Sequence, residues 1–208
     1  MVESQLRARG IADERVLEAM DRVPRESFLP EGLHVRAYDD AALPIGEGQT
    51  MSQPYMVARI CELLSLSGHE RVLDVGTGSG YQAAVLAELA SEVHSIERIP
   101  ELAEDARRRL AESGYADRVQ VHVGDGTRGL PDHAPFRAIA VAAAAPELPE
   151  TLYEQLEPGG RLVVPVGGRW EQFLQVVVRT PEGPAVVRTV PCRFVPLLGA
   201  EGFHGRER

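Results

Sequence analysis

The sequence contains no lysine and no asparagine, so its 22 basic residues other than histidine are all arginines. Without a lysine, the chain cannot form a Schiff base with a carbonyl substrate or with pyridoxal phosphate, and it cannot build the phosphate-binding loop that ends in a lysine. These classes of enzyme are therefore excluded. The codon usage of a high-GC genome explains both absences, but the chemical restriction holds whatever their cause.

Positive charge is scarce overall, because 31 acidic residues outnumber the arginines and give a formal net charge of −9. The acidic residues are spread along the chain, and such a surface repels a phosphate backbone. We therefore expect no nucleic-acid partner. The one dense basic run, residues 107–109, follows a helical pattern and is interpreted as a solvated helix face.

Cysteines and long apolar runs are rare too. Cys61 and Cys192 lie far apart without a C-x-x-C partner, which is typical of a reducing compartment. The first ten residues lack the apolar stretch of a signal peptide, and the longest apolar run, residues 138–145, is far below the roughly 18 residues that span a membrane. We expect a soluble, cytoplasmic protein with no membrane partner, and a monomer is the simplest oligomeric state.

Histidine motifs are also missing. None of the six histidines lies in a catalytic motif, so we expect each of them on the surface or in the core, and we expect no metal site. They are His34, His69, His94, His122, His133 and His204.

The length of 208 residues suits one α/β domain and is short for two. We expect a single domain with a helical N-terminal segment over residues 1–68, a ligand-binding core over 69–166 and a β-rich C-terminal segment over 167–208. In the core, short strands alternate with helices, which predicts right-handed crossovers and a mostly parallel sheet. Strands are predicted at 71–75, 92–97, 119–123, 136–141 and 161–166, helices at 81–90, 100–112 and 148–156, and an antiparallel edge hairpin at 172–179 and 185–195.

The first third of the chain is predicted to be helical with irregular joints. Asp13 is placed to cap a short helix that stops before Pro24. Residues 30–54 are rich in turn signals and are predicted to form a functional loop. After Pro54 the apolar residues follow a helical period, and Gly68 is predicted to end that helix.

The most informative stretch is VLDVGTGSGY at 72–81, a predicted strand that enters a glycine-rich turn before a helix. In a dinucleotide fingerprint the third glycine would follow Gly78 by three positions, where this chain has the bulky Tyr81, and this disfavours NAD. Asp74 and Asp125 place two carboxylates around a ligand that carries an amine, an adenine and a sulfonium but no phosphate. The pattern therefore suits S-adenosylmethionine.

Glu97 ends the second predicted strand, where a carboxylate can accept hydrogen bonds from ribose hydroxyls. The same position serves NAD, so Glu97 indicates a ribose without choosing the cofactor. Taken alone, Glu97 has the alternative reading of a strand-end acid paired with Arg98, and Asp125 that of a turn residue.

Several motifs together resemble those of bacterial protein-L-isoaspartate O-methyltransferases. In chain order they are LPIGEGQTMSQPYM at 43–56, the glycine-rich turn, SIER at 95–98, GDG at 124–126, PGGRL at 158–162 and FVPL at 194–197. The 43–56 run is specific to this family, whereas many methyltransferases share the later motifs. The chain departs from the family pattern at Met51, where isoleucine is usual, and at Ala142, where threonine is common and a wall of the peptide site is affected.

The resemblance implies a class I S-adenosylmethionine-dependent methyltransferase with a Rossmann-like, doubly wound sheet. It implies methyl transfer to the α-carboxylate of L-isoaspartyl residues in peptides and proteins, which starts protein repair and leaves S-adenosyl-L-homocysteine. By the same resemblance Ser52 is the active-site serine. The implied cofactor residues are Asp74, Gly76, Thr77, Gly78, Ser79, Gly80, Glu97, Arg98, Asp125 and Gly126. The implied substrate residues are Thr50, Met51, Gln53, Pro54, Val195, Pro196 and Leu197.

The nucleophile of such a reaction needs no deprotonation by the protein, because a carboxylate with a pKa near 3.5–4 is already ionised at neutral pH. No general base is needed, and the work is alignment and exclusion of water. Free backbone N–H groups where residues 50–54 precede a predicted helix, together with the Ser52 hydroxyl, would hold the anion, although Ser52 or Gln53 as a plain helix cap is the alternative. Three other functions stay open: methylation of one dedicated peptide partner, an NAD(P)-dependent oxidoreductase, and a peptide-recognition module.

Overall fold

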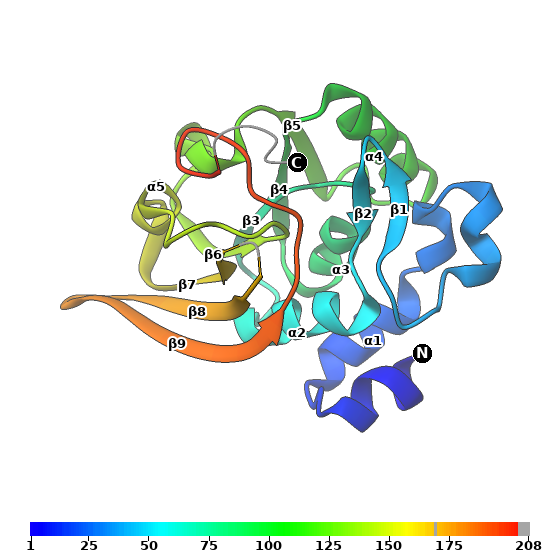
Figure 1. Cartoon of the computed structure of the whole chain (residues 1–208), viewed down its shortest axis with the longest axis horizontal. Helices are drawn as coiled ribbons and strands as arrows, with labels where there is room; N and C mark the ends of the chain where they lie inside the picture. The colour runs from blue at the N-terminus through cyan, green and yellow to red at the C-terminus, as the bar shows by residue number, and fades with distance from the viewer. Residues whose placement is uncertain (169, 204–208) are drawn as a thin grey trace.

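A seven-stranded sheet forms the centre of the computed structural model, which describes residues 1–168 and 170–203 (Figure 1). His204 therefore lies outside the described residues. The strand order is β5-β4-β3-β6-β7-β8-β9. The first five strands pair in parallel, whereas β8 pairs antiparallel with both β7 and β9. This order confirms the predicted doubly wound α/β class with an antiparallel edge. The strands are β3 (Arg71–Val75), β4 (Glu92–Glu97), β5 (Val119–Val123), β6 (Phe136–Val141), β7 (Leu156–Gly167), β8 (Gln172–Thr180) and β9 (Gly183–Cys192).

Helices cover both faces of the sheet, because successive residues of a buried parallel strand point to opposite sides. In β4, Val93 packs in the apolar layer that contains α1, α2, α3 and α4, whereas Ile96 packs in the layer that contains α5. Both layers consist mainly of buried aliphatic side chains. The helices are α1 (Glu14–Arg22), α2 (Pro54–Leu64), α3 (Tyr81–Leu89), α4 (Pro100–Glu112) and α5 (Glu150–Glu154).

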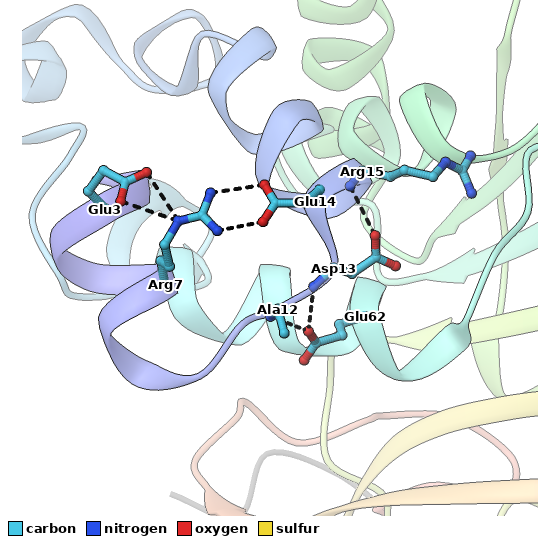
Figure 2. Close-up of polar contacts among 7 residues, drawn as sticks. All are labelled: Glu3, Arg7, Ala12, Asp13, Glu14, Arg15 and Glu62. Atoms are coloured by element: carbon cyan, nitrogen blue, oxygen red, sulfur yellow. Dashed lines mark hydrogen bonds and ion pairs between the residues drawn. The ribbon is translucent and has the colours of Figure 1, made fainter.

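The N-terminal segment is fastened to α2 by backbone hydrogen bonds to a single carboxylate (Figure 2). The N–H groups of Ala12 and Asp13 both donate to Glu62 Oε1, at 2.7 and 3.1 Å. The Asp13 side chain accepts from Arg15 N at 2.9 Å, which confirms the predicted helix cap. Arg7 adds ion pairs to neighbouring carboxylates that are largely exposed, so Glu62 and the cap are the stronger restraints on this joint.

The stretch between Pro30 and Pro54 is more regular than predicted. It contains a short 3-10 helix (Glu31–Arg36) and an antiparallel hairpin of β1 (Leu43–Gly46) and β2 (Gln49–Met51) (Figure 1). In β1 buried and exposed residues alternate, as a half-buried strand requires, but a proline and a glycine at the exposed positions conceal this pattern.

Two smaller expectations are corrected. Helix α2 ends at Leu64, where Ser65 takes a left-handed conformation with φ of 53°, so Gly68 does not end it. In the arginine run of α4, Arg107 and Arg108 pair with exposed acids, whereas Arg109 is only 8% exposed and packs inward. Among the helices of the described chain, none is long and apolar enough to cross a membrane.

Candidate functional site

A pocket opens at the carboxyl ends of β3 and β4, the position where parallel α/β sheets bind ligands. Its walls come from stretches that are far apart in the sequence. The lining residues are Gln49, Thr50, Met51, Ser52, Val57, Val75, Gly76, Thr77, Gly78, Ser79, Tyr81, Gln82, Ile96, Glu97, Arg98, Ile99, Gly126, Ala142, Ala143, Val195, Pro196, Leu197 and Leu198.

The glycine-rich turn forms the floor of this pocket. Gly76 and Gly78 have φ angles of 94° and 53°, conformations that residues with a Cβ rarely adopt. A Cβ atom on Gly78 would lie 3.2 Å from the Ile45 side chain of β1, so the hairpin packs directly against the turn. Gly80 belongs to the turn but does not line the pocket.

The Glu97 carboxylate is held rigidly at the pocket wall. It accepts a hydrogen bond from Gly78 N at 2.9 Å on one oxygen and from Ile99 N at 3.0 Å on the other, and it is 7% exposed. Arg98 also lines the pocket, but no ion pair joins it to Glu97 within the described part of the chain. Each carboxylate oxygen keeps a lone pair for a ligand, as a ribose site requires.

Asp74 lies behind the wall and not on it. Its oxygens accept from Gln82 Nε2 and from Ser95 Oγ, both at 2.8 Å, and Ser95 Oγ is 2.6 Å from Thr77 Oγ1. Burial raises the pKa of Asp74 to about 6 despite these hydrogen bonds. Asp74 therefore acts on the pocket through Gln82 and Thr77, which do line it.

Gln82 was not predicted as a site residue. Its Oε1 is buried and has no hydrogen-bond partner among the described residues, although the pocket borders the side chain. A buried acceptor without a donor is unfavourable by about 1–3 kcal/mol, so this atom is suited to a ligand that donates. The available signal was a polar residue in the first turn of helix α3, whose next five residues are apolar.

Asp125 is turned toward the C-terminal segment. Its carboxylate accepts from Thr127 N, from Thr127 Oγ1 at 2.7 Å and from Ala200 N at 2.9 Å, so it caps a 3-10 turn and anchors residue 200. The geometry matches the turn-residue alternative. Gly126, the next residue, lines the pocket.

The segment before α2 supplies the wall opposite the glycine-rich turn. Thr50, Met51 and Ser52 line the pocket, but Gln53 and Pro54 do not. The Gln53 side chain donates to Asp40 Oδ1 at 2.7 Å, and α2 has no side-chain cap, so the plain-cap interpretation is not what the structure shows. The Ser52 hydroxyl has no hydrogen-bond partner within residues 1–168 and 170–203, which leaves it available to a ligand.

A buried arginine fixes the backbone of this segment and was not predicted. Arg25 Nη2 donates to the Ser52 carbonyl at 2.6 Å, and its Nε donates to the Ala37 carbonyl at 2.7 Å. The guanidinium lies 4.9 Å from the centre of the buried Tyr81 ring. Burial lowers the pKa of Arg25, and no described carboxylate pairs with it, so carbonyl oxygens and a ring face hold the charge.

The last wall is formed by Val195, Pro196 and Leu197, three of the residues for which the resemblance implied substrate contacts. Leu197 N donates to Ala144 O, and Ala144 N donates to Val195 O, both at 2.8 Å. These bonds hold the C-terminal segment against the turn after β6, where Ala142 and Ala143 complete the wall.

Comparison with known proteins agrees with this arrangement. Residues 1–202 match the family model described as protein-L-isoaspartate(D-aspartate) O-methyltransferase (PCMT). A protein-L-isoaspartate O-methyltransferase of Methanoculleus marisnigri is 55% identical over 208 residues, covering 99% of this chain and 93% of the relative. A Marinobacter nauticus protein-L-isoaspartate O-methyltransferase 2 is 56% identical over 207 residues, covering 98% and 93%.

Solved structures resemble the chain over nearly its whole length. One protein-L-isoaspartate O-methyltransferase superimposes with a TM-score of 0.83 at 30% identity, covering 97% of this chain and 67% of that one. A Plasmodium falciparum protein named as a beta-aspartate methyltransferase, in complex with S-adenosyl-L-homocysteine, gives 0.80 at 26% identity, covering 95% and 96%. The chain belongs to the protein-L-isoaspartate(D-aspartate) O-methyltransferase family.

Proposed function

We propose that the chain transfers a methyl group from S-adenosylmethionine to the α-carboxylate of L-isoaspartyl residues in peptides and proteins. The observation that carries the proposal is the pocket itself, in which Ser52 and its neighbours face the glycine-rich turn and Glu97. Membership of the family supports the same activity. Product S-adenosyl-L-homocysteine and the methyl ester that begins protein repair follow from it.

The pocket residues fit S-adenosylmethionine better than a phosphate-bearing cofactor. Glu97 is suited to ribose hydroxyls, and the unpartnered Gln82 Oε1, backed by Asp74, is suited to an ammonium group. Arg98 is the one basic side chain among the lining residues, so the pocket has little to offer a pyrophosphate. When bound, S-adenosylmethionine supplies a methyl group on a positively charged sulfur, and its transfer to a carboxylate requires no proton.

The chain's own residues would orient the substrate carboxylate and exclude water from it. The substrate carboxylate would accept a hydrogen bond from the Ser52 hydroxyl. It would lie before the N-terminus of α2, where the helix dipole favours an anion. Met51, Val57 and Leu197 provide apolar surface around the reacting oxygen, which removes water from a weak nucleophile. No residue is asked to act as a base.

The direct test offers methyl-labelled S-adenosylmethionine with matched isoaspartyl and aspartyl peptides. We expect label only in the isoaspartyl member of each pair, as a base-labile ester. Equal labelling of both members would contradict the substrate assignment. Labelling across several unrelated isoaspartyl peptides distinguishes general repair from a single dedicated partner, and a binding titration with NAD tests the oxidoreductase alternative.

Glu97→Ala is expected to raise the dissociation constant for S-adenosylmethionine by roughly 10- to 100-fold, because charge-assisted hydrogen bonds of about 1.5–3 kcal/mol are lost. Calorimetry measures the change. Glu97→Gln keeps one acceptor oxygen for Gly78 N, so its dissociation constant should lie between those of wild type and Glu97→Ala. Glu101→Ala, on the exposed start of α4, is the matched control, and an unaltered affinity in Glu97→Ala would remove the ribose role.

Asp74 should make the stability of the ligand-free chain depend on pH. Its folded pKa of about 6 is above the ordinary value, so its favourable contribution is complete below pH 4 and is lost as the pH rises to 6. Relative to wild type, Asp74→Asn should gain roughly 2–3 kcal/mol in unfolding free energy between pH 4 and pH 8. Urea unfolding at several pH values measures this gain, with the exposed Asp132→Asn as control. A pH-independent difference would contradict it.

The proposal also includes a cytoplasmic location and a monomeric enzyme. Cys61 and Cys192 are both free thiols, which is typical of proteins in a reducing compartment. The substrate partners would be damaged peptides and proteins, and no nucleic-acid or membrane partner is part of the proposal.

A further inference from the structure

Three histidines that are far apart in the sequence lie close together in the fold. His94 lies in β4, His122 in β5, and His133 in the 3-10 turn Pro131–His133 that precedes β6. His94 Nδ1 is 3.1 Å from His122 Nε2, and one ring nitrogen of each of the three residues lies within 4.8 Å of the others. The mechanism above uses none of them.

The cluster lies on the face of the sheet opposite α4. His94 has the same side-chain direction as Ile96, which packs in the layer with α5, and its ring is edge-on to Phe136 at 5.9 Å between centroids. His94 is 1% exposed, whereas His122 and His133 are partly exposed. The three rings therefore form a site with a buried base and an open side.

A carboxylate already orients the most buried ring. His94 Nε2 lies 2.9 Å from Glu92 Oε1, and Glu92 Oε2 accepts from Arg71 Nε at 2.8 Å. Because an ionised carboxylate only accepts, the proton of His94 is on Nε2 and the lone pair of Nδ1 points into the cluster. A histidine that binds a metal ion commonly donates its other N–H to a carboxylate in this way.

The spacing of the nitrogens suits a small four-coordinate cation. Two imidazole nitrogens bound to Zn²⁺ at 2.0–2.1 Å in a tetrahedron are about 3.3 Å apart, close to the His94–His122 separation. The third ring has to approach by roughly 1.5 Å, and His133 is on a short turn where side-chain rotation achieves this. An all-imidazole set also suits Zn²⁺ and not Mg²⁺ or Ca²⁺, which prefer oxygen ligands.

We propose that His94, His122 and His133 form a binding site for a divalent transition-metal ion, with Zn²⁺ the ion that the geometry fits. Glu92 and Arg71 form the supporting layer, and water completes the coordination on the open side. The ion would join β4, β5 and the turn before β6, so its role is to stabilise this edge of the sheet. The sequence led us to expect no metal site, and this proposal replaces that expectation.

The test titrates Zn²⁺ into the metal-free full-length protein by calorimetry. We expect one saturable site per chain, and at least tenfold weaker binding in His122→Gln and in His133→Gln. At a hundredfold excess over the dissociation constant, Zn²⁺ should raise the melting temperature of wild type by roughly 5–10 °C. Both variants replace partly exposed side chains, so they keep the test valid even if a change at the buried His94 prevents folding.

His69→Gln is the matched control, because His69 is an exposed histidine outside the cluster and its loss should leave Zn²⁺ binding unchanged. Co²⁺ serves as a spectroscopic probe, since four-coordinate Co²⁺ absorbs visible light far more strongly than the hydrated ion. The proposal is overturned if wild type shows no saturable site, or if both cluster variants bind Zn²⁺ as tightly as wild type.

Discussion

Replacing Arg25 by methionine is expected to lower the unfolding free energy by roughly 2–4 kcal/mol and the melting temperature by roughly 5–15 °C. The guanidinium is fully buried, and its donors satisfy the carbonyls of Ala37 and Ser52. Methionine fills similar space without donors, so the buried Ala37 carbonyl and the partly buried Ser52 carbonyl lose their donor. The desolvation penalty of the buried cation is relieved at the same time, which keeps the net loss below the sum of the two hydrogen bonds.

The same substitution should reduce methyl transfer by roughly 100-fold while S-adenosylmethionine still binds. Arg25 does not line the pocket, but it holds the Ser52 carbonyl at 2.6 Å, and a shift of about 1 Å in a substrate-positioning group has an effect of this size. The loss should appear mainly in kcat at temperatures where the variant is folded.

Two further variants serve as a conservative replacement and a control for Arg25→Met. Arg25→Lys keeps the charge and one donor but not the fork that reaches two carbonyls, so it should recover activity only partly. Arg36→Met removes an exposed arginine that pairs with Asp39 and should change neither stability nor kcat appreciably. Wild-type stability and kcat in Arg25→Met would show that Arg25 does not position the segment.

Ser52→Ala should reduce kcat/KM for an isoaspartyl peptide by roughly 100-fold, the effect of removing one hydrogen-bond donor from a developing-charge site. The dissociation constant of S-adenosylmethionine should stay within about twofold, because the glycine-rich turn and Glu97 are untouched. The hydroxyl makes no hydrogen bond in the described chain, so its removal should leave the melting temperature almost unchanged.

This separation of effects distinguishes a substrate contact from a structural role. Ser52→Thr, which keeps a hydroxyl, should recover part of the activity, and Ser27→Ala, at an exposed serine far from the pocket wall, is the matched control. Turnover on an isoaspartyl peptide that equals wild type would discard the assignment of Ser52.

Local patterns predicted most of the sheet. The strands at 71–75, 92–97, 119–123 and 136–141 were predicted with the observed bounds, because glycines, prolines and charged residues interrupt the apolar runs of a buried parallel sheet. The hairpin at 43–51 was missed, because its exposed positions carry Pro44 and Gly46, and such residues in a short stretch indicate turns.

In the site, the sequence pattern placed those residues whose position is set by a backbone conformation. Gly76, Gly78 and Glu97 lie where the strand-turn-helix pattern puts them. Sequence spacing says less where side-chain direction decides: Asp74 faces Gln82 behind the wall and Asp125 faces residue 200, and their roles toward the cofactor stay predictions. Arg25 reaches a carbonyl 27 residues away, and no spacing rule in a single sequence indicates such a contact.

The way the pocket is assembled has a consequence for how the protein loses activity. Its wall joins stretches as distant as residues 49–52 and 195–198, so the complete wall forms only when both of these stretches are folded onto the sheet. In a domain that unfolds cooperatively, such contacts are lost together. In a denaturation series, cofactor affinity should therefore disappear along the same curve as circular dichroism, which makes ligand binding a direct gauge of how much of a preparation is native.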